Sequence, residues 1–349
     1  MGVVSSSVEV NVDKNAAFRF IADPRNIEHV YPDALRFKIL EVPEHISDGS
    51  RIRMEARLLG QRFEWYSIVK DYMEGVGFTD EAVGSPFLLW RHTHTVRDVE
   101  AGDGDGNGSA HARYHSSKRC IIDDRIEFRT ILGPIGDMFA ERMISSMLEY
   151  RNNKIKSVLE GKSINEGVVN YRDPTIISLA KGTALCTMMT LLGLLIPIYA
   201  QGLNDSLLLL FANGVAWFLL WFFTHDLLHL VIGRLVGVRF SHFYIGLSNL
   251  VRALRISPRY RMLFIALGIK IDRDGSNASR RGYTMMYISG PLASMLIPFY
   301  VPSFILLNHG IDNIGLFFLA VSIINLVLDA VMSSKHGCIR KGVRALTKR

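Results

Sequence analysis

Cysteine is scarce in this chain, which contains only three among its 349 residues. They are Cys120, Cys186 and Cys338, and no two of them form a C-x-x-C pair. This scarcity excludes a disulfide framework and a zinc ribbon, and it fits a reducing compartment. The first thirteen residues also lack the basic and apolar regions of a cleavable secretion signal. We therefore expect the N-terminal half to stay in the cytoplasm.

Lys and Arg are missing from two short stretches, 201–205 and 308–314, which separate long apolar runs. A run of about 20 apolar residues is long enough to span a bilayer. We predict four such spans, near Ile176–Ala200, Ser206–Val238, Tyr283–Leu307 and Gly315–Met332. Basic residues gather instead before the first span, between the second and third, and in the tail. The positive-inside rule then predicts a multi-pass cell-membrane protein with both termini in the cytoplasm.

The net charge of +7 could also indicate a nucleic-acid-binding protein. The basic residues of the second half, however, lie between apolar spans and are not interleaved with aromatic residues on one face. We therefore predict the lipid bilayer as a partner, and no nucleic acid.

The first 160 residues alternate apolar and polar side chains in several runs, which is typical of half-buried antiparallel strands. The clearest runs cover residues 5–12, 51–59, 87–96 and 123–132. Helical residues follow Asp13, a predicted N-cap, and Pro24 closes the first helical piece. A long helix is predicted over 135–159, with apolar residues on one broad face. The fold class is therefore α+β, with a curved antiparallel sheet around a long C-terminal helix.

Two segments of this half, "SPFLLWRHTHTV" and "DDRIEFRTILGPIGDMF", resemble the START-like (SRPBCC) helix-grip domains, which include polyketide cyclases and lipid carriers. The resemblance implies an apolar small-molecule or lipid ligand between sheet and helix. Its predicted contacts are Trp90, Met138, Phe139, Met143 and Met147.

Two further patterns of this half have simpler explanations. His92 and His94 fall on the same face of a strand and could be metal ligands, but no third donor is indicated. We expect them to line a surface or a cavity. The stretch "DGDGNG", 103–108, begins like a calcium loop, yet Tyr114 stands where a bidentate Glu is required. It is predicted to be a hairpin connection.

His225 and His229 lie one helical turn apart within the second apolar run. This spacing places both imidazoles on one face, as a single tetrahedral metal ion requires. The simpler alternative is a pair of polar residues that hydrogen-bond neighbouring helices. A zinc site also needs a third protein ligand, and the end of the fourth span offers Asp329, one turn after Asn325, or His336.

Three blocks of the second half resemble the site-2-protease-like intramembrane zinc metalloproteases. They are "HDLLHLVIGRLVGVRF", "ISGPLASML", which contains Gly290 and Pro291, and "INLVLDAVMSSKHG". The resemblance implies that His225 and His229 bind zinc, that Asp226 takes the place of the general base, and that the substrate is a transmembrane peptide.

The chain departs from that family at several positions. Asp226 is one methylene shorter than the family's Glu, Ser294 replaces an Asn, and Leu328 replaces a Pro. The alternative function is therefore a non-catalytic, membrane-anchored lipid-binding or regulatory protein with a decayed protease site. A di-iron centre is excluded, because it needs about eight histidines and the membrane half has five.

These patterns predict two domains joined by a linker. Residues 1–162 form the cytoplasmic START-like domain, 163–174 the linker, and 175–349 an all-α membrane domain of about four transmembrane helices.

Overall fold

The structure is a computed structural model that describes residues 1–99, 119–161, 171, 173–248 and 256–347. The "DGDGNG" stretch and most of the predicted linker lie outside these residues. The chain divides into two compact units: residues 1–175 with 256–265 (unit 1), and residues 176–255 with 266–349 (unit 2).

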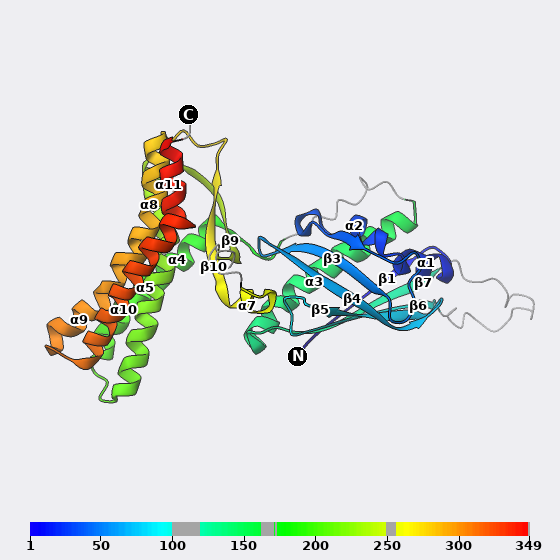
Figure 1. Cartoon of the computed structure of the whole chain (residues 1–349), viewed down its shortest axis with the longest axis horizontal. Coiled ribbons are helices and arrows are strands. Elements are labelled where there is room, and N and C mark those ends of the chain that lie inside the picture. The colour runs from blue at the N-terminus through cyan, green and yellow to red at the C-terminus, as the bar shows by residue number, and fades with distance from the viewer. Residues whose placement is uncertain (100–118, 162–170, 172, 249–255, 348–349) are drawn as a thin grey trace, which may run out of the picture. The chain divides into compact units, whose positions relative to one another are not determined.

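Unit 1 contains a seven-stranded sheet in which every two neighbouring strands are antiparallel (Figure 1). The strand order is β1-β7-β6-β5-β4-β3-β2. The strands are β1 (Gly2–Val10), β2 (Lys38–Glu41), β3 (Arg51–Leu58), β4 (Gln61–Met73), β5 (Gly77–Val83), β6 (Leu89–Asp98) and β7 (Cys120–Arg129). The four strands predicted from alternation correspond to β1, β3, β6 and β7.

Alternation in β7 shows why this segment is a strand. Cys120, Ile122, Ile126 and Phe128 are fully buried and face the core, together with Asp124, whereas the residues between them are less buried. Side chains of a strand point alternately to opposite faces, so one face of β7 joins the core and the other does not. Asp124 is therefore a charged residue at a core position.

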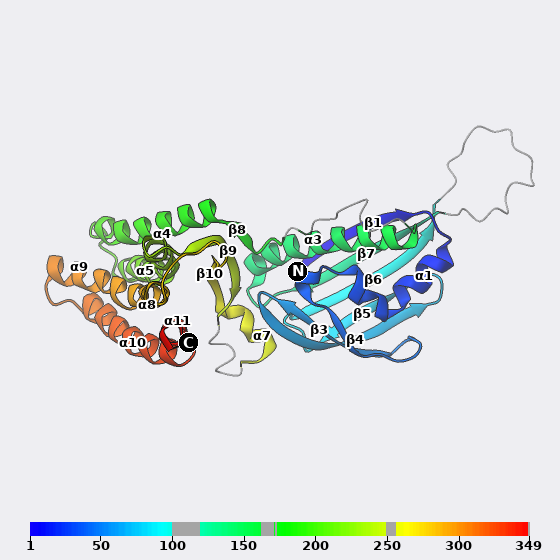
Figure 2. The same cartoon turned by 90° about the horizontal axis from the view of Figure 1, so that it is seen from above.

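Two sets of helices accompany the sheet. The short ones are α1 (Lys14–Ala22), a 3₁₀ turn over Pro24–Asn26, α2 (Ile27–Val30) and a second 3₁₀ turn over Asp33–Leu35. The predicted N-cap is confirmed, because the Asp13 carboxylate accepts a hydrogen bond from the Ala16 amide at 3.0 Å. The long helix α3 (Gly133–Leu159) runs along the sheet (Figure 2). Pro134 stands in its first turn, where proline needs no amide partner.

Unit 2 contains four helical stretches that are long and apolar enough to cross a membrane, within the residues that the structure describes. They are α4 (Leu179–Ala200), α5 (Ser206–Leu235), the continuous stretch of α8 (Arg280–Leu296), a 3₁₀ turn (Ile297–Phe299) and α9 (Tyr300–His309), and α10 (Asn313–Lys335). Only 17% of the most apolar 18-residue stretch of α10 is buried. A helix in water buries its apolar face, so these outward apolar side chains suit contact with lipid.

The remaining elements of unit 2 were not predicted. A three-stranded sheet, in the order β10-β9-β8, joins β8 (Ile176–Ser178), β9 (Arg239–Leu247) and β10 (Ile265–Asp272). In the sequence, α7 (Pro258–Arg261) and a 3₁₀ turn (Met262–Phe264) come between β9 and β10 but belong to unit 1, and α11 (Cys338–Thr347) follows α10 in unit 2. The first apolar helix thus begins at Leu179, because Ile176–Ser178 pairs with β9 and the Ser178 hydroxyl caps the Lys181 amide.

Candidate functional sites

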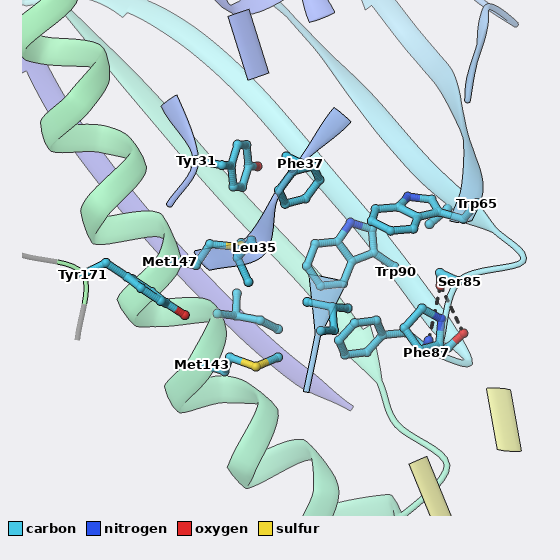
Figure 3. A pocket seen from close by; sticks show the side chains of 14 residues that line it. Tyr31, Leu35, Phe37, Trp65, Ser85, Phe87, Trp90, Met143, Met147 and Tyr171 are labelled. Atoms are coloured by element: carbon cyan, nitrogen blue, oxygen red, sulfur yellow. Dashed lines mark hydrogen bonds between the residues drawn. The ribbon is translucent and has the colours of Figure 1, made fainter. Parts of the chain in front are cut away.

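Unit 1 holds an apolar cavity between α3 and the inner face of the sheet (Figure 3). The volume of the cavity is about 50 Å³. Six of its lining residues are aromatic, and Ser85 supplies one of the few polar groups. The lining residues are Tyr31, Leu35, Phe37, Leu58, Trp65, Ala82, Ser85, Pro86, Phe87, Trp90, Met143, Ile144, Met147 and Tyr171. Such walls suit an apolar ligand with a flat ring system.

The structure brings three of the five predicted contact residues to this cavity. Trp90 comes from β6, and Met143 and Met147 come from successive turns of α3. Met138 is 57% exposed and Phe139 is not among the lining residues. Helix periodicity explains the exposure of Met138, because Met143, Met147 and Ile144 share one face while Met138 lies on another. Phe139 shares the face of Met143 but lies one turn before it, beyond the cavity lining.

A buried cluster of charged residues lies one helical turn beyond the cavity. Arg151 follows Met147 by four residues on α3, and its guanidinium lies 6.0 Å from the centroid of the Tyr31 ring, which also lines the cavity. The Asp124 carboxylate accepts hydrogen bonds from Arg151, from His92 Nε2 at 2.9 Å and from His94 Nδ1 at 2.8 Å. The ionic groups therefore satisfy one another, as burial in a core requires.

The pKa values of the two histidines in this cluster are shifted in opposite directions. Burial lowers the pKa of His92 to about 4, and the neighbouring His94 lowers it too. Burial also acts against protonation of His94, but hydrogen bonds to Asp124 and Asp80 outweigh it and raise the His94 pKa. The cluster thus favours one imidazolium, at His94. Asp80, His92 and His94 have metal-ligand spacing, but Asp124 already engages both histidines, and Asp80 accepts hydrogen bonds from Ser67 and His94.

Unit 2 brings together the predicted metal ligands His225 and His229. Their Nε2 atoms lie 3.2 Å apart. The other nitrogen of His229, Nδ1, lies 2.6 Å from the Met286 carbonyl oxygen of α8. A carbonyl can only accept a hydrogen bond, so His229 Nδ1 carries the proton and Nε2 has a free lone pair. An outer hydrogen bond of this kind commonly orients a metal-binding histidine.

Gly290 makes room for the His229 ring. A Cβ atom at this position would lie 2.3 Å from His229 Nε2, far inside van der Waals contact. The adjacent Pro291 is buried within α8. Gly290 therefore belongs to the surface against which His229 packs.

Asp329 reaches His225 through an intermediate side chain. Its Oδ2 lies 2.8 Å from Ser294 Oγ, and Ser294 Oγ lies 3.3 Å from His225 Nδ1. Asn325, one turn before Asp329, donates a hydrogen bond to the Ser294 carbonyl at 2.9 Å. Asp329 is thus placed to orient the His225 imidazole through the Ser294 hydroxyl.

The structure places the other predicted residues differently. His336 is exposed at the C-terminal cap of α10, outside the histidine group. Asp226 is buried, and within the described part of the chain its carboxylate has no hydrogen-bond partner. Cys338, which the sequence analysis did not select, lies with its Sγ 3.9 Å from His225 Nε2.

Comparison with known proteins gives weak likenesses only. No protein-family profile matches the chain, and no curated protein matches it. A START superfamily protein from Mycobacterium smegmatis is 14% identical and covers 46% of this chain and 99% of its own, with a TM-score of 0.34. The di-domain ARO/CYC BexL from the BE-7585A biosynthetic pathway is 14% identical over 54% of this chain and 56% of its own, with a TM-score of 0.35. A protein from Arthrobacter aurescens is 13% identical over 46% and 87%, with a TM-score of 0.35. At this level no ligand or activity passes from them to this chain.

Proposed function

We propose that this protein binds an apolar, flat small molecule or lipid in the cavity of unit 1 and is anchored in a membrane by unit 2. The observation that carries the proposal is the aromatic and thioether lining of the cavity, in which Trp65 and Trp90 from the sheet lie opposite Met143 and Met147 from α3 (Figure 3). Aromatic rings and the adaptable methionine side chain suit such a ligand.

Native mass spectrometry of the detergent-purified full chain tests this proposal. We expect a co-purified small molecule, or binding of added naphthalene as a probe. Met147→Trp fills the cavity and should reduce occupancy about tenfold, a change of about 1.4 kcal/mol. Met138→Trp is the matched control, because Met138 belongs to the same helix but is exposed. Equal occupancy in both variants, or no binding by the unmodified chain, would contradict the proposal.

We also propose a second function, because a separate observation favours it: unit 2 holds a zinc ion between His225 and His229. Two nitrogens bound to one tetrahedral zinc ion at about 2.05 Å lie roughly 3.3 Å apart, and these two Nε2 atoms are 3.2 Å apart. When bound, zinc polarises a carbonyl and activates a water molecule for hydrolysis. The reaction predicted from the sequence is cleavage of a transmembrane peptide, with Asp226 as the base.

The metal content of the purified chain tests the zinc proposal. About one zinc ion per chain is expected, and a His225→Ala and His229→Ala double variant should lose it. Cleavage of a transmembrane peptide tests the reaction separately. If Asp226→Asn abolishes cleavage and retains zinc, the peptidase function stands. Zinc without any cleavage would instead leave a structural site, which corresponds to the non-catalytic alternative.

A further inference from the structure

Cys338 is the third metal-capable side chain beside the two membrane histidines. One ligand atom from each of His225, His229 and Cys338 lies within 4.8 Å of the other two. Within the described residues only one other group, in unit 1, has this property. The thiol belongs to the first turn of α11, whereas both histidines belong to α5.

The outer hydrogen bonds of the two imidazoles suit a cation between their Nε2 atoms. His229 Nδ1 donates to Met286, which leaves the Nε2 lone pair free. Ser294 has one hydroxyl proton, and its nearest acceptor is the Asp329 carboxylate at 2.8 Å. Ser294 Oγ then accepts from His225 Nδ1, so His225 Nε2 also presents a lone pair. Two lone pairs 3.2 Å apart repel each other unless a positive charge joins them.

The distances to sulfur agree with a shared metal ion. A nitrogen at about 2.05 Å and a sulfur at about 2.3 Å from a tetrahedral zinc ion lie roughly 3.6 Å apart. The distance from Cys338 Sγ to His225 Nε2 is 3.9 Å. A shift of a few tenths of an ångström, well within the reach of one side-chain torsion, closes the difference.

The packing of α11 on α8 holds Cys338 in this position. The helix is interrupted at His336 and Gly337 between α10 and α11, where the Ser333 hydroxyl accepts a hydrogen bond from the Ile339 amide at 3.2 Å. Thr284 of α8 donates to the Gly342 carbonyl of α11 at 3.0 Å. The two helices run side by side (Figure 1), and Gly342 allows their close approach, because a Cβ there would lie 3.3 Å from Ile288.

We infer that the Cys338 thiolate is the third protein ligand of the metal ion held by His225 and His229. This inference rests on the zinc-binding function proposed above. Asp329 then acts as a positioning residue through Ser294 and His225. Two imidazoles and one thiolate select zinc or cobalt rather than magnesium or calcium, which prefer oxygen ligands. Metal binding releases the thiol proton to solvent, so the site gains the ion and loses one proton.

Cobalt reconstitution of the full chain in detergent tests this inference. Cobalt bound by a thiolate has a strong near-ultraviolet charge-transfer absorption, which cobalt bound only by imidazoles lacks. We expect this absorption in the unmodified chain and its loss in Cys338→Ala, with zinc affinity at least tenfold lower. Cys186→Ala is the matched control, since Cys186 is a buried cysteine of the same unit, and it should retain the absorption.

The outcomes separate this inference from the zinc proposal. A chain that binds zinc through the histidines, but shows no thiolate absorption and keeps its affinity in Cys338→Ala, overturns only the role of Cys338. A chain that binds no more metal than the double histidine variant overturns both. The nearly isosteric Cys338→Ser gives the same comparison if Cys338→Ala fails to fold.

Discussion

Gly290 sets the position of a metal-binding ring although it has no side chain of its own. Gly290→Ala would place a methyl group 2.3 Å from His229 Nε2 and displace the imidazole. We predict about a 10- to 100-fold loss of zinc affinity, the range seen when the outer support of a metal ligand is removed. Gly214→Ala on α5 is the control, because its nearest neighbour would be 3.8 Å away. Unchanged zinc affinity in Gly290→Ala, measured by competition with a chelator, would contradict the prediction.

We predict that the histidines beside Asp124 give unit 1 a stability maximum near neutral pH. A histidine in the unfolded chain has a pKa of about 6.5. The raised pKa of His94 contributes stability that is fully present below pH 6.5 and is lost as the pH rises through the folded value. The lowered pKa of His92, about 4, removes stability as the pH falls from about 6.5 toward 4, because the unfolded chain then binds more protons.

Pulse proteolysis of the full chain at several pH values measures this profile. His92→Gln should flatten its acidic side and His94→Gln its alkaline side. The charged groups that face these two residues are Asp80, Asp124 and Arg151. A stability that rises steadily from pH 5 to pH 9 would show that the cluster does not act in this way.

Sequence analysis could predict the histidine pair, because ligand spacing along one helix is a local pattern. It could not predict Cys338, which is 113 residues from His225 along the chain and adjoins it only through the packing of α11 on α8. The same limit applies to Asp124, whose partners come from β6 and α3. The sequence does contain one indication of that cluster, because Asp124 is a charged residue at a core position of an alternating strand.

At the scale of the helix, Gly182 allows α4 to approach β9. A Cβ atom at this position would lie 2.2 Å from the Phe243 ring, which is fully buried. We predict that Gly182→Ala destabilises unit 2 by about 1–3 kcal/mol through overpacking. Thermal unfolding in detergent measures the effect, with Gly202→Ala as the control, since its nearest neighbour would be 3.8 Å away. Equal melting temperatures for the two variants would refute it.

The strands of unit 2 escaped prediction because β9 lacks strict alternation. Its buried residues are Phe240, Phe243, Gly246 and Leu247, which follow no period of two. β4 and β5 also went unpredicted, although Phe63 and Val69 are buried at alternating positions of β4. The long apolar helices were predicted well, because the run of apolar residues that indicates each helix is local in the sequence and depends only on composition.

At the scale of the whole molecule, the distribution of basic residues predicts the orientation in the membrane. The loop at 201–205 has none, whereas residues 270–281 contain Lys270, Arg273, Arg280 and Arg281. In a chain without native cysteines, Asn204→Cys should react with a membrane-impermeant maleimide in intact cells. Asp274→Cys should react only after the membrane is permeabilised. The reverse labelling pattern would show that the protein is inserted the other way.

Pairing of β8 with β9 also limits how the first two apolar helices can move. Ile176, Ile177 and Ser178 pair with Tyr244, Phe243 and His242, directly before α4 begins and shortly after α5 ends. Axial sliding of α4 along α5 would break these backbone hydrogen bonds. The short turn at 201–205 joins the two helices at one end, and the strand pairing ties them at the other, so the segment of α5 that carries His229 is held in place from both sides.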